Sequence, residues 1–215
     1  MLKLDLHTHS SDSPDGAITM DQYARVIEDG TLDYVAVTDH DSITHALELR
    51  KLLGDHIIVG QEITSSEGEI IGLFLTSPVP PRLSALETAQ AIKHQGGLVY
   101  VPHPFETVRK GITTTTLDHI MELVDIIEVY NGRAVLQNKG PQAATVARLQ
   151  SKAGTASSDA HGVKGLGTAY SAIKEAPTAK NLLSQLETAH LIMRRPPLQT
   201  LLYPKANRLK KRLRR

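Results

Sequence analysis

Histidine and acidic side chains recur in this sequence immediately after short apolar segments. Five of the ten histidines occupy such positions, each with a carboxylate or a second histidine close by. Together with Asp15, in a PDG turn after the first segment, these positions are His7, His9, Asp39, His40, Glu62, His103, Asp159 and His161. Imidazole and carboxylate ligands without a thiolate suit zinc, manganese or iron. The pattern therefore predicts a site for divalent cations.

The spacing within each motif is compatible with a shared pocket. Residues i and i+2 of a strand point to the same face, so His7 can reach one pocket with His9, and Asp159 with His161. A single HxH pair is more often structural than metal-binding, and the coincidence of several motifs is what favours a metal site. The remaining histidines show no such pattern and are interpreted as ordinary surface or partly buried residues: His45, His56, His94, His119 and His190.

Phosphate chemistry is one use of such a cluster. A carboxylate such as Glu62 could bridge two cations, and two cations a few ångströms apart bind phosphate and activate water at neutral pH. Arg133, after the segment IIEVY, and Arg109, in HPFETVRKG, are candidate phosphate ligands because a guanidinium holds two oxygens at once. Both could instead form surface salt bridges. Asn131 joins the candidate catalytic residues with Asp39, which we expect to orient a metal-bound histidine rather than bind metal.

The elements that would position these residues alternate along the chain. Apolar runs predict strands at residues 2–6, 34–38, 57–63, 70–75, 98–101, 126–130, 155–158 and 191–193. Helical patterns cover residues 20–28, 44–53, 86–95, 117–123, 141–149 and 182–189. This alternation predicts an α/β fold with a mainly parallel sheet. Six or seven such units favour a closed or distorted barrel, whose sites lie at the carboxyl ends of the strands.

Composition limits the class of protein. A chain of 215 residues with 40% hydrophobic and 22% charged residues is typical of one globular domain. The absence of cysteine excludes disulfides, thiolate metal sites and cysteine nucleophiles. The N-terminus MLKLDLHTHS reaches charged residues too early for a signal peptide, and no apolar run approaches the ~18 residues of a membrane span. We therefore expect a cytoplasmic protein.

The net charge of +1 conceals an asymmetry. The last nine residues, NRLKKRLRR, carry six basic residues, and the rest of the chain is acidic. An acidic body does not favour a broad nucleic-acid-binding face. We expect a domain over residues 1–204 and a disordered basic tail over residues 205–215. The alternative is a short amphipathic helix, with Leu209 and Leu213 four residues apart, that contacts an anionic surface such as lipid or RNA.

The motifs HTHSSDSPDG, VTDHD, GQEIT, VPHP, EVYNGR and SSDAHG resemble, in this order, those of the PHP (polymerase and histidinol phosphatase) superfamily. The resemblance extends from Leu4 to about Tyr170. It implies a distorted (β/α)7 barrel that holds up to three metal ions, usually zinc, manganese or iron. It also implies hydrolysis of phosphate esters, which in this superfamily include histidinol phosphate, nucleoside phosphates and nucleic-acid ends.

The same resemblance implies a division of the ligands among three metals. The first would be bound by His7, His9, Glu62 and Asp159, the second by Glu62 as a bridge and His103, and the third by Asp15, His40 and His161. Asp12 is the alternative to Asp15. Many members of the superfamily place a metal-binding histidine just before a strand like IIGLFL, where this chain has Glu69. Glu69 is either an oxygen ligand, which would favour a harder ion, or a solvent-facing carboxylate.

The function predicted from these features is hydrolysis of phosphate mono- or diesters, on a small phosphorylated substrate or nucleotide, by a metal-activated water. A second hypothesis is the trimming of oligonucleotide ends, with the basic tail adding phosphate attraction. Aromatic residues make up only 4% of the chain, so few are present to stack on bases. A third hypothesis is a metal-stabilised binding module without catalysis.

Overall fold

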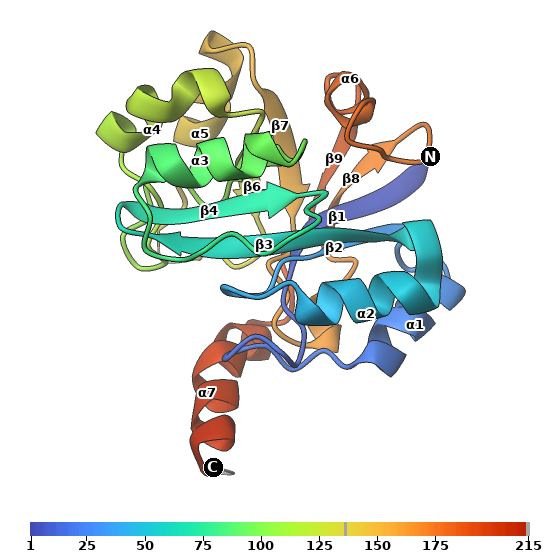
Figure 1. Ribbon diagram of the computed structural model, residues 1–215. Helices are drawn as coiled ribbons and strands as arrows, with labels where there is room; N and C mark the ends of the chain where they lie inside the picture. Colours follow the sequence, from blue (N-terminus) through green and yellow to red (C-terminus); the bar gives the residue numbers. More distant parts are fainter. Residues whose placement is uncertain (136, 214–215) are drawn as a thin grey trace.

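A curled nine-stranded sheet with most of the helices on its outer side makes up most of the computed structural model (Figure 1), which describes residues 1–135 and 137–213. The strands are β1 (Leu2–Thr8), β2 (Tyr34–Val37), β3 (Ile57–Ser65), β4 (Gly68–Leu73), β5 (Leu98–Val101), β6 (Ile126–Asn131), β7 (Ala153–Ser157), β8 (Ala169–Ile173) and β9 (His190–Met193). The α-helices are α1 (Met20–Glu28), α2 (Thr44–Leu53), α3 (Ala85–His94), α4 (Thr114–Ile120), α5 (Gly140–Leu149), α6 (Leu182–Leu186) and α7 (Tyr203–Leu213).

The strand order is β7-β6-β5-β4-β3-β2-β1-β8-β9. The pairs β1–β2, β2–β3, β5–β6 and β6–β7 are parallel, whereas β4 runs antiparallel to both of its neighbours. Strand β8 pairs antiparallel with β1, and β9 pairs antiparallel with β8. The sheet is therefore less parallel than the sequence predicts. The reason is local, because only two residues join β3 to β4, and a connection that short can only form an antiparallel hairpin.

The seven strands β1 to β7 form a nearly closed barrel in chain order. Thr8 at the end of β1 bridges to Ala160, and the His9 backbone N–H donates to the Ala160 carbonyl at 2.9 Å. The Ser158 N–H donates to Asp5 Oδ1 at 3.1 Å across the same seam. The predicted distorted α/β barrel is confirmed.

Alternating strand residues build two apolar layers. Val35 and Val37 belong to a cluster between the sheet and helices α1 to α5, whereas Ala36 between them belongs to a second cluster on the other face. Leu182 and Leu186 of α6 pack into that second cluster. Because both faces are covered, the strands are held rigidly and their carboxyl ends have defined positions.

Two elements differ from the main expectation. Strand β8 was not expected, because its sequence AYSAI lacks a strong apolar pattern, and its pairing with β1 creates it. Helix α7 replaces the expected disordered tail, as in the alternative of a short amphipathic helix, and it starts before residue 205. Its Pro204 and Asn207 are buried, so tertiary contacts order this segment. Arg214 and Arg215 lie outside the described residues.

Among the described residues, no helix is both long enough and apolar enough to cross a bilayer.

Candidate metal centre

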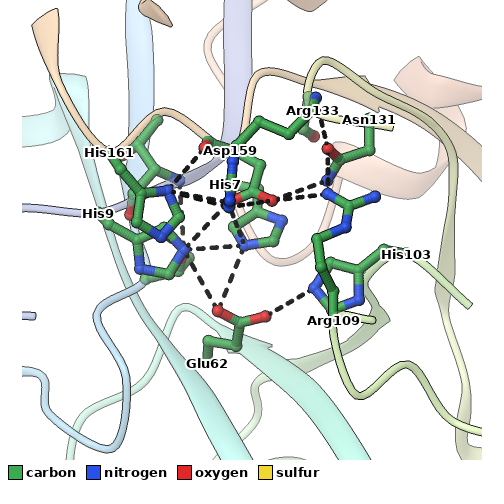
Figure 2. Close-up of polar contacts among 12 residues, drawn as sticks. His7, His9, Glu62, His103, Arg109, Asn131, Arg133, Asp159 and His161 are labelled. Carbon is green, nitrogen blue, oxygen red and sulfur yellow. Dashed lines mark hydrogen bonds and ion pairs between the residues drawn. The ribbon is translucent and has the colours of Figure 1, made fainter. Parts of the chain in front are cut away.

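Residues on or just after five strands converge at one end of the barrel, and Figure 2 shows six of them, His7, His9, Glu62, His103, Asp159 and His161, facing one another. Strand β1 supplies His7 and is followed by His9, β2 is followed by His40, β3 supplies Glu62, β5 is followed by His103, and β7 by Asp159 and His161. Asp15, from the loop after β1, reaches the same cluster. The structure thus brings together all of the ligands that the sequence predicts. Their role as ligands stays a prediction.

Glu62 lies at the centre of this cluster and contacts four imidazoles. Its Oε2 lies 3.2 Å from His9 Nε2, 3.3 Å from His40 Nδ1 and 3.5 Å from His7 Nε2. Its Oε1 lies 3.0 Å from His103 Nε2. The two oxygens therefore face different histidines, which is the arrangement that a carboxylate bridging two cations requires.

Asp159 approaches the cluster from the opposite side. Its Oδ1 lies 3.3 Å from His161 Nδ1, 3.4 Å from His9 Nε2 and 3.6 Å from His7 Nε2. The His7 and His9 Nε2 atoms are themselves only 3.1 Å apart. Two imidazole nitrogens at this distance share one proton or face a common cation.

Asp15 and not Asp12 is the acidic residue near His40 and His161. Asp15 Oδ2 lies 3.6 Å from His40 Nε2 and 3.5 Å from His161 Nε2. Asp12 is exposed and accepts a hydrogen bond from Ser42 Oγ at 2.7 Å. The geometry thus favours the choice of Asp15.

Three overlapping groups of candidate ligand atoms emerge, with all atoms of each group within 4.8 Å of one another. They are His7 with Glu62 and His103, His7 with His9 and Asp159, and His9 with Asp15, His40 and His161. His7 and His9 each belong to two groups, so His9 is shared with the group expected to hold a third metal. These nitrogen and oxygen donors fit zinc, manganese or iron. His103 Nδ1 is buried without a hydrogen-bond partner among the described residues.

Burial and neighbouring charges shift the pKa values of the clustered side chains. Burial lowers the pKa of His9, but hydrogen bonds with Asp159 and Glu62 outweigh burial and raise that pKa to about 10. Burial raises the pKa of Glu62, but neighbouring His40 and His7 hold it well below its ordinary value. Glu62 is thus ionised, and the protonated His9 beside it compensates its charge. Bound cations would supply the same positive charge.

Two of the clustered residues adopt left-handed backbone conformations. His103 has φ of 29° and Asp159 has φ of 51°. Such conformations are strained for residues other than glycine, and strained residues are common at functional sites. The surrounding loops therefore hold these two side chains in place against a local preference.

Glu128 supports the cluster, and the sequence analysis missed it. Its Oε1 lies 3.2 Å from His7 Nδ1 and accepts from Tyr100 OH at 2.7 Å. Its Oε2 accepts from the His103 N–H at 2.7 Å and from Asn131 Nδ2 at 2.8 Å. The available signal was an acidic residue inside the apolar segment IIEVY, because a buried carboxylate requires partners.

The candidate phosphate ligands lie beside the cluster. Arg109 Nη1 donates to Asp159 Oδ2 at 2.8 Å, and Arg133 Nη1 donates to the same oxygen at 3.2 Å. Arg109 is also held by Glu106 Oε2, at 2.7 and 2.9 Å. Asn131 Oδ1 accepts from Arg133 N at 2.8 Å and also from Arg109 Nη1 at 2.5 Å. Neither arginine forms a plain surface salt bridge.

Asp39 has a different partner from the one expected. Its carboxylate accepts from the Ser10 backbone N–H at 2.6 Å and from the Ser10 hydroxyl at 2.5 Å. The predicted orientation of a histidine ring by Asp39 is therefore corrected, because the chain turns after His9 and places Ser10 against this carboxylate. Asp39 instead fixes the backbone next to His9.

Glu69 is buried, so the solvent-facing alternative is wrong. Its Oε2 lies 3.8 Å from His103 Nε2 and its Oε1 lies 3.9 Å from His40 Nδ1. Burial, together with nearby Glu62, raises its pKa to about 8. Glu69 is thus placed where an additional oxygen ligand would be.

The cluster opens into a cavity of about 920 Å³. Candidate ligands, Arg109 and Arg133 form part of its lining, and helix α7 forms another part. The cavity is large enough for a small organic phosphate or a few nucleotides.

Comparisons with known proteins agree with this geometry. The PHP domain family matches residues 5–163, and a PHP-associated family matches residues 140–190. The uncharacterized protein MJ1587 of Methanocaldococcus jannaschii is 33% identical over 150 residues, which cover 64% of this chain and 88% of that protein.

Solved structures with low sequence identity share the fold. A two-domain protein from Bacteroides vulgatus containing a predicted PHP-like metal-dependent phosphoesterase superposes with a TM-score of 0.69 at 18% identity, over 90% of this chain and 65% of that chain. The lesion-specific endonuclease PfuEndoQ from Pyrococcus furiosus gives a TM-score of 0.64 at 17% identity, over 88% of this chain and 57% of that chain. This chain therefore spans less than two thirds of either structure.

The family match covers most of the chain and includes every converging residue from His7 to His161. The barrel and the order of its motifs agree with the same assignment. This chain belongs to the PHP domain family.

Proposed function

We propose that this chain is a metal-dependent phosphoesterase that hydrolyses phosphate mono- or diesters. The observation that carries the proposal is the position of Glu62, whose two oxygens face four histidines beside a cavity that Arg109 and Arg133 line. Membership of the PHP domain family supports the same reaction class.

The three overlapping ligand groups are compatible with two or three divalent cations. When bound, such cations activate water and neutralise phosphate charge as Lewis acids. Glu62 would bridge two positions, and Glu69 would add an oxygen near His40 and His103. Zinc, manganese and iron all suit these donors.

Arg109 and Arg133 would bind the substrate phosphate. Both reach Asp159 Oδ2 and line the cavity, so a phosphate beside Asp159 would lie within reach of two guanidinium groups. Asn131 and Glu106 would keep the Arg109 guanidinium oriented toward this position.

The trimming of oligonucleotide ends is the second candidate function. The structural similarity to a lesion-specific endonuclease and the basic helix α7 beside the cavity favour it. A metal-stabilised binding module without catalysis is the third, and the following experiment separates all three.

The test combines elemental analysis with a phosphate-release screen over sugar phosphates, histidinol phosphate, nucleotides and short oligonucleotides, with zinc, manganese or iron. We expect bound metal and activity in the wild type. The Glu62→Gln variant should lose metal and at least about 100-fold in rate, because even partners outside the ligand shell change metal affinity or activity 10–100-fold. Glu48→Gln, on the exposed side of α2, is the matched control and should behave like the wild type. Metal-loaded protein without activity on any substrate would refute the proposal.

A further inference from the structure

Helix α7 is tied to the loops that carry the candidate ligands. Asn207 Nδ2 donates to the Asp15 carbonyl at 2.8 Å and to the His161 carbonyl at 3.1 Å. Lys211 Nζ donates to the Ser11 carbonyl at 2.7 Å and also to the Ser13 carbonyl. The helix is therefore a fixed part of the cavity wall, although it is the last described element of the chain.

Arg208 brings the charge of α7 directly to the cluster. Its Nη2 lies 2.7 Å from Asp15 Oδ2, the oxygen that also faces His40 and His161. The cation on this helix thus touches a candidate ligand of the third metal.

The sequence YPKANRLKKRL of α7 has five basic residues and no acidic residue. Four of the five line the cavity, at helical spacings of three and four that place them on one face: Lys205, Arg208, Lys211 and Arg212. Leu209 and Leu213 are exposed. The basic face of the amphipathic helix is therefore the one that faces the cavity.

Much of this charge is uncompensated. Lys205 and Arg212 form no ion pair with any residue that the structure describes, whereas Arg208 pairs with Asp15. Arg109, Lys110 and Arg133 line the same cavity, where they pair with Glu106, Glu69 and Asp159, so the unpaired charge lies on α7. Unpaired cations in the wall of a cavity attract anions to it. Such a cavity is suited to a ligand with more than one anionic group.

We infer that α7 is a specificity element, in which Lys205, Arg208 and Arg212 bind a second phosphate group of the substrate, apart from the one hydrolysed. This inference rests on the proposed phosphoesterase function and adds the substrate class, a molecule with at least two phosphates. Successive basic residues on one helix face are about 4.5–6 Å apart along the axis, so they can contact a phosphate at more than one depth of the cavity. A small bisphosphate and the neighbouring phosphodiester of a nucleic-acid strand share this chemistry.

The test compares two matched substrate pairs. Fructose 6-phosphate and fructose 1,6-bisphosphate differ by one phosphate, whereas thymidine 5′-monophosphate and 5′-phosphorylated dithymidylate differ by one nucleotide, whose phosphodiester is the second phosphate group. We expect kcat/KM to be at least about tenfold higher for the second member of one pair, since a charge-assisted contact contributes a factor of this order. The pair with the larger preference identifies the source of the second phosphate.

The variant Lys205→Gln/Arg212→Gln should lose most of that preference, and Lys205→Arg/Arg212→Lys should keep it. The charge-matched control Lys210→Gln/Lys180→Gln changes two exposed residues outside the cavity lining and should leave the preference unaltered. Thermal unfolding of each variant checks that the fold is retained.

A second readout does not depend on catalysis. Fluorescence anisotropy of labelled, 5′-phosphorylated tetrathymidylate, and competition by fructose 1,6-bisphosphate, measure binding to the full chain. We expect about tenfold weaker binding of the preferred probe for Lys205→Gln/Arg212→Gln than for the control. If the wild type hydrolyses nothing, the proposed function fails while this readout still decides the role of α7. Equal kcat/KM within both pairs, or equal binding by variant and control, would overturn the inference.

Discussion

Glu128 shows how much a single buried residue contributes to this site without reaching the cavity. One carboxylate accepts from Tyr100, Asn131 and the His103 backbone and holds the Nδ1 atom of His7. A carboxylate in this position fixes the tautomer of the imidazole and leaves Nε2 free to bind a cation. The positions of His7 and His103 therefore depend on the same side chain.

We predict that Glu128→Gln lowers metal affinity or the rate of phosphate release by about 10–100-fold. The amide keeps the size of the side chain but no longer holds His7 with a negative charge. Calorimetric metal titration and single-substrate kinetics measure both effects. Glu122→Gln, an exposed residue nearby in the sequence, is the control. Wild-type affinity and rate in Glu128→Gln would show that His7 needs no such partner.

The proton on His9 should compete with a metal ion for the same ring. The pKa of His9 is about 10 in the metal-free cluster, so the ring is protonated at pH 7.5 and must lose its proton to bind a cation. Metal binding should therefore release protons, and the apparent affinity should rise with pH below about 10. Calorimetric titration of zinc or manganese in two buffers of different ionisation enthalpy counts the protons. A count of zero at pH 7.5 would contradict this prediction.

At the scale of elements, the seam between β1 and β7 depends on Asp5. Its Oδ1 accepts from the backbone N–H groups of Ser158 and His7, while its Oδ2 has no partner among the described residues. Burial raises the pKa of Asp5 to about 7. Since this folded-state pKa exceeds the ordinary value of 3.8, the stability contributed by this group is complete below about pH 4 and is lost as pH rises through 7.

We predict that Asp5→Asn reduces this loss, because the amide keeps the acceptor oxygen and cannot ionise. Relative to the wild type, its free energy of unfolding should rise between pH 4 and pH 8 by on the order of 2–4 kcal/mol. Denaturant unfolding with a chelator present measures the difference. Asp5→Leu, which leaves the Ser158 N–H unpaired, should instead be destabilised by about 1–3 kcal/mol at pH 4. Parallel pH curves for the wild type and Asp5→Asn would disprove the assignment.

At the scale of the whole molecule, the C-terminal helix α7 packs against the loops that follow β1 and β7. A Cβ atom built at Gly162 would lie 2.6 Å from the Tyr203 ring, so only glycine allows α7 to begin there. The backbone of Gly162 is extended, with φ of −171°, and alanine would tolerate it. The glycine is therefore required by the close approach of α7 and not by its own conformation.

We predict that Gly162→Ala loosens α7 without unfolding the barrel. Overpacking of this kind costs about 1–3 kcal/mol, so amide hydrogen exchange in residues 203–213 should accelerate roughly 5- to 100-fold while that of β1 to β7 is unchanged. Leu209→Ala, on the exposed side of α7, serves as the control. Uniform acceleration over the whole chain, or none in α7, would show that this contact does not dock the helix.

Features that depend on residues close in sequence could be predicted from the sequence alone. The capping box of Thr19 and Gln22 starts α1 where the sequence predicts it, and the alternation of apolar runs predicts the barrel. The motifs at strand ends identify the family and the residues that converge. These features depend on interactions within a few residues or on the general rule that strand ends share one edge.

Only the tertiary structure decided which distant side chains meet. Glu128 lies 121 residues from His7, and Arg208 lies 193 residues from Asp15, yet each pair is in contact. These contacts between residues far apart in sequence depend on the closure of the barrel and on the docking of α7. Both result from many contacts across the whole chain. A charged tail read alone resembles a disordered terminus, and it becomes a cavity wall because the loops after β1 and β7 offer it carbonyls and a carboxylate.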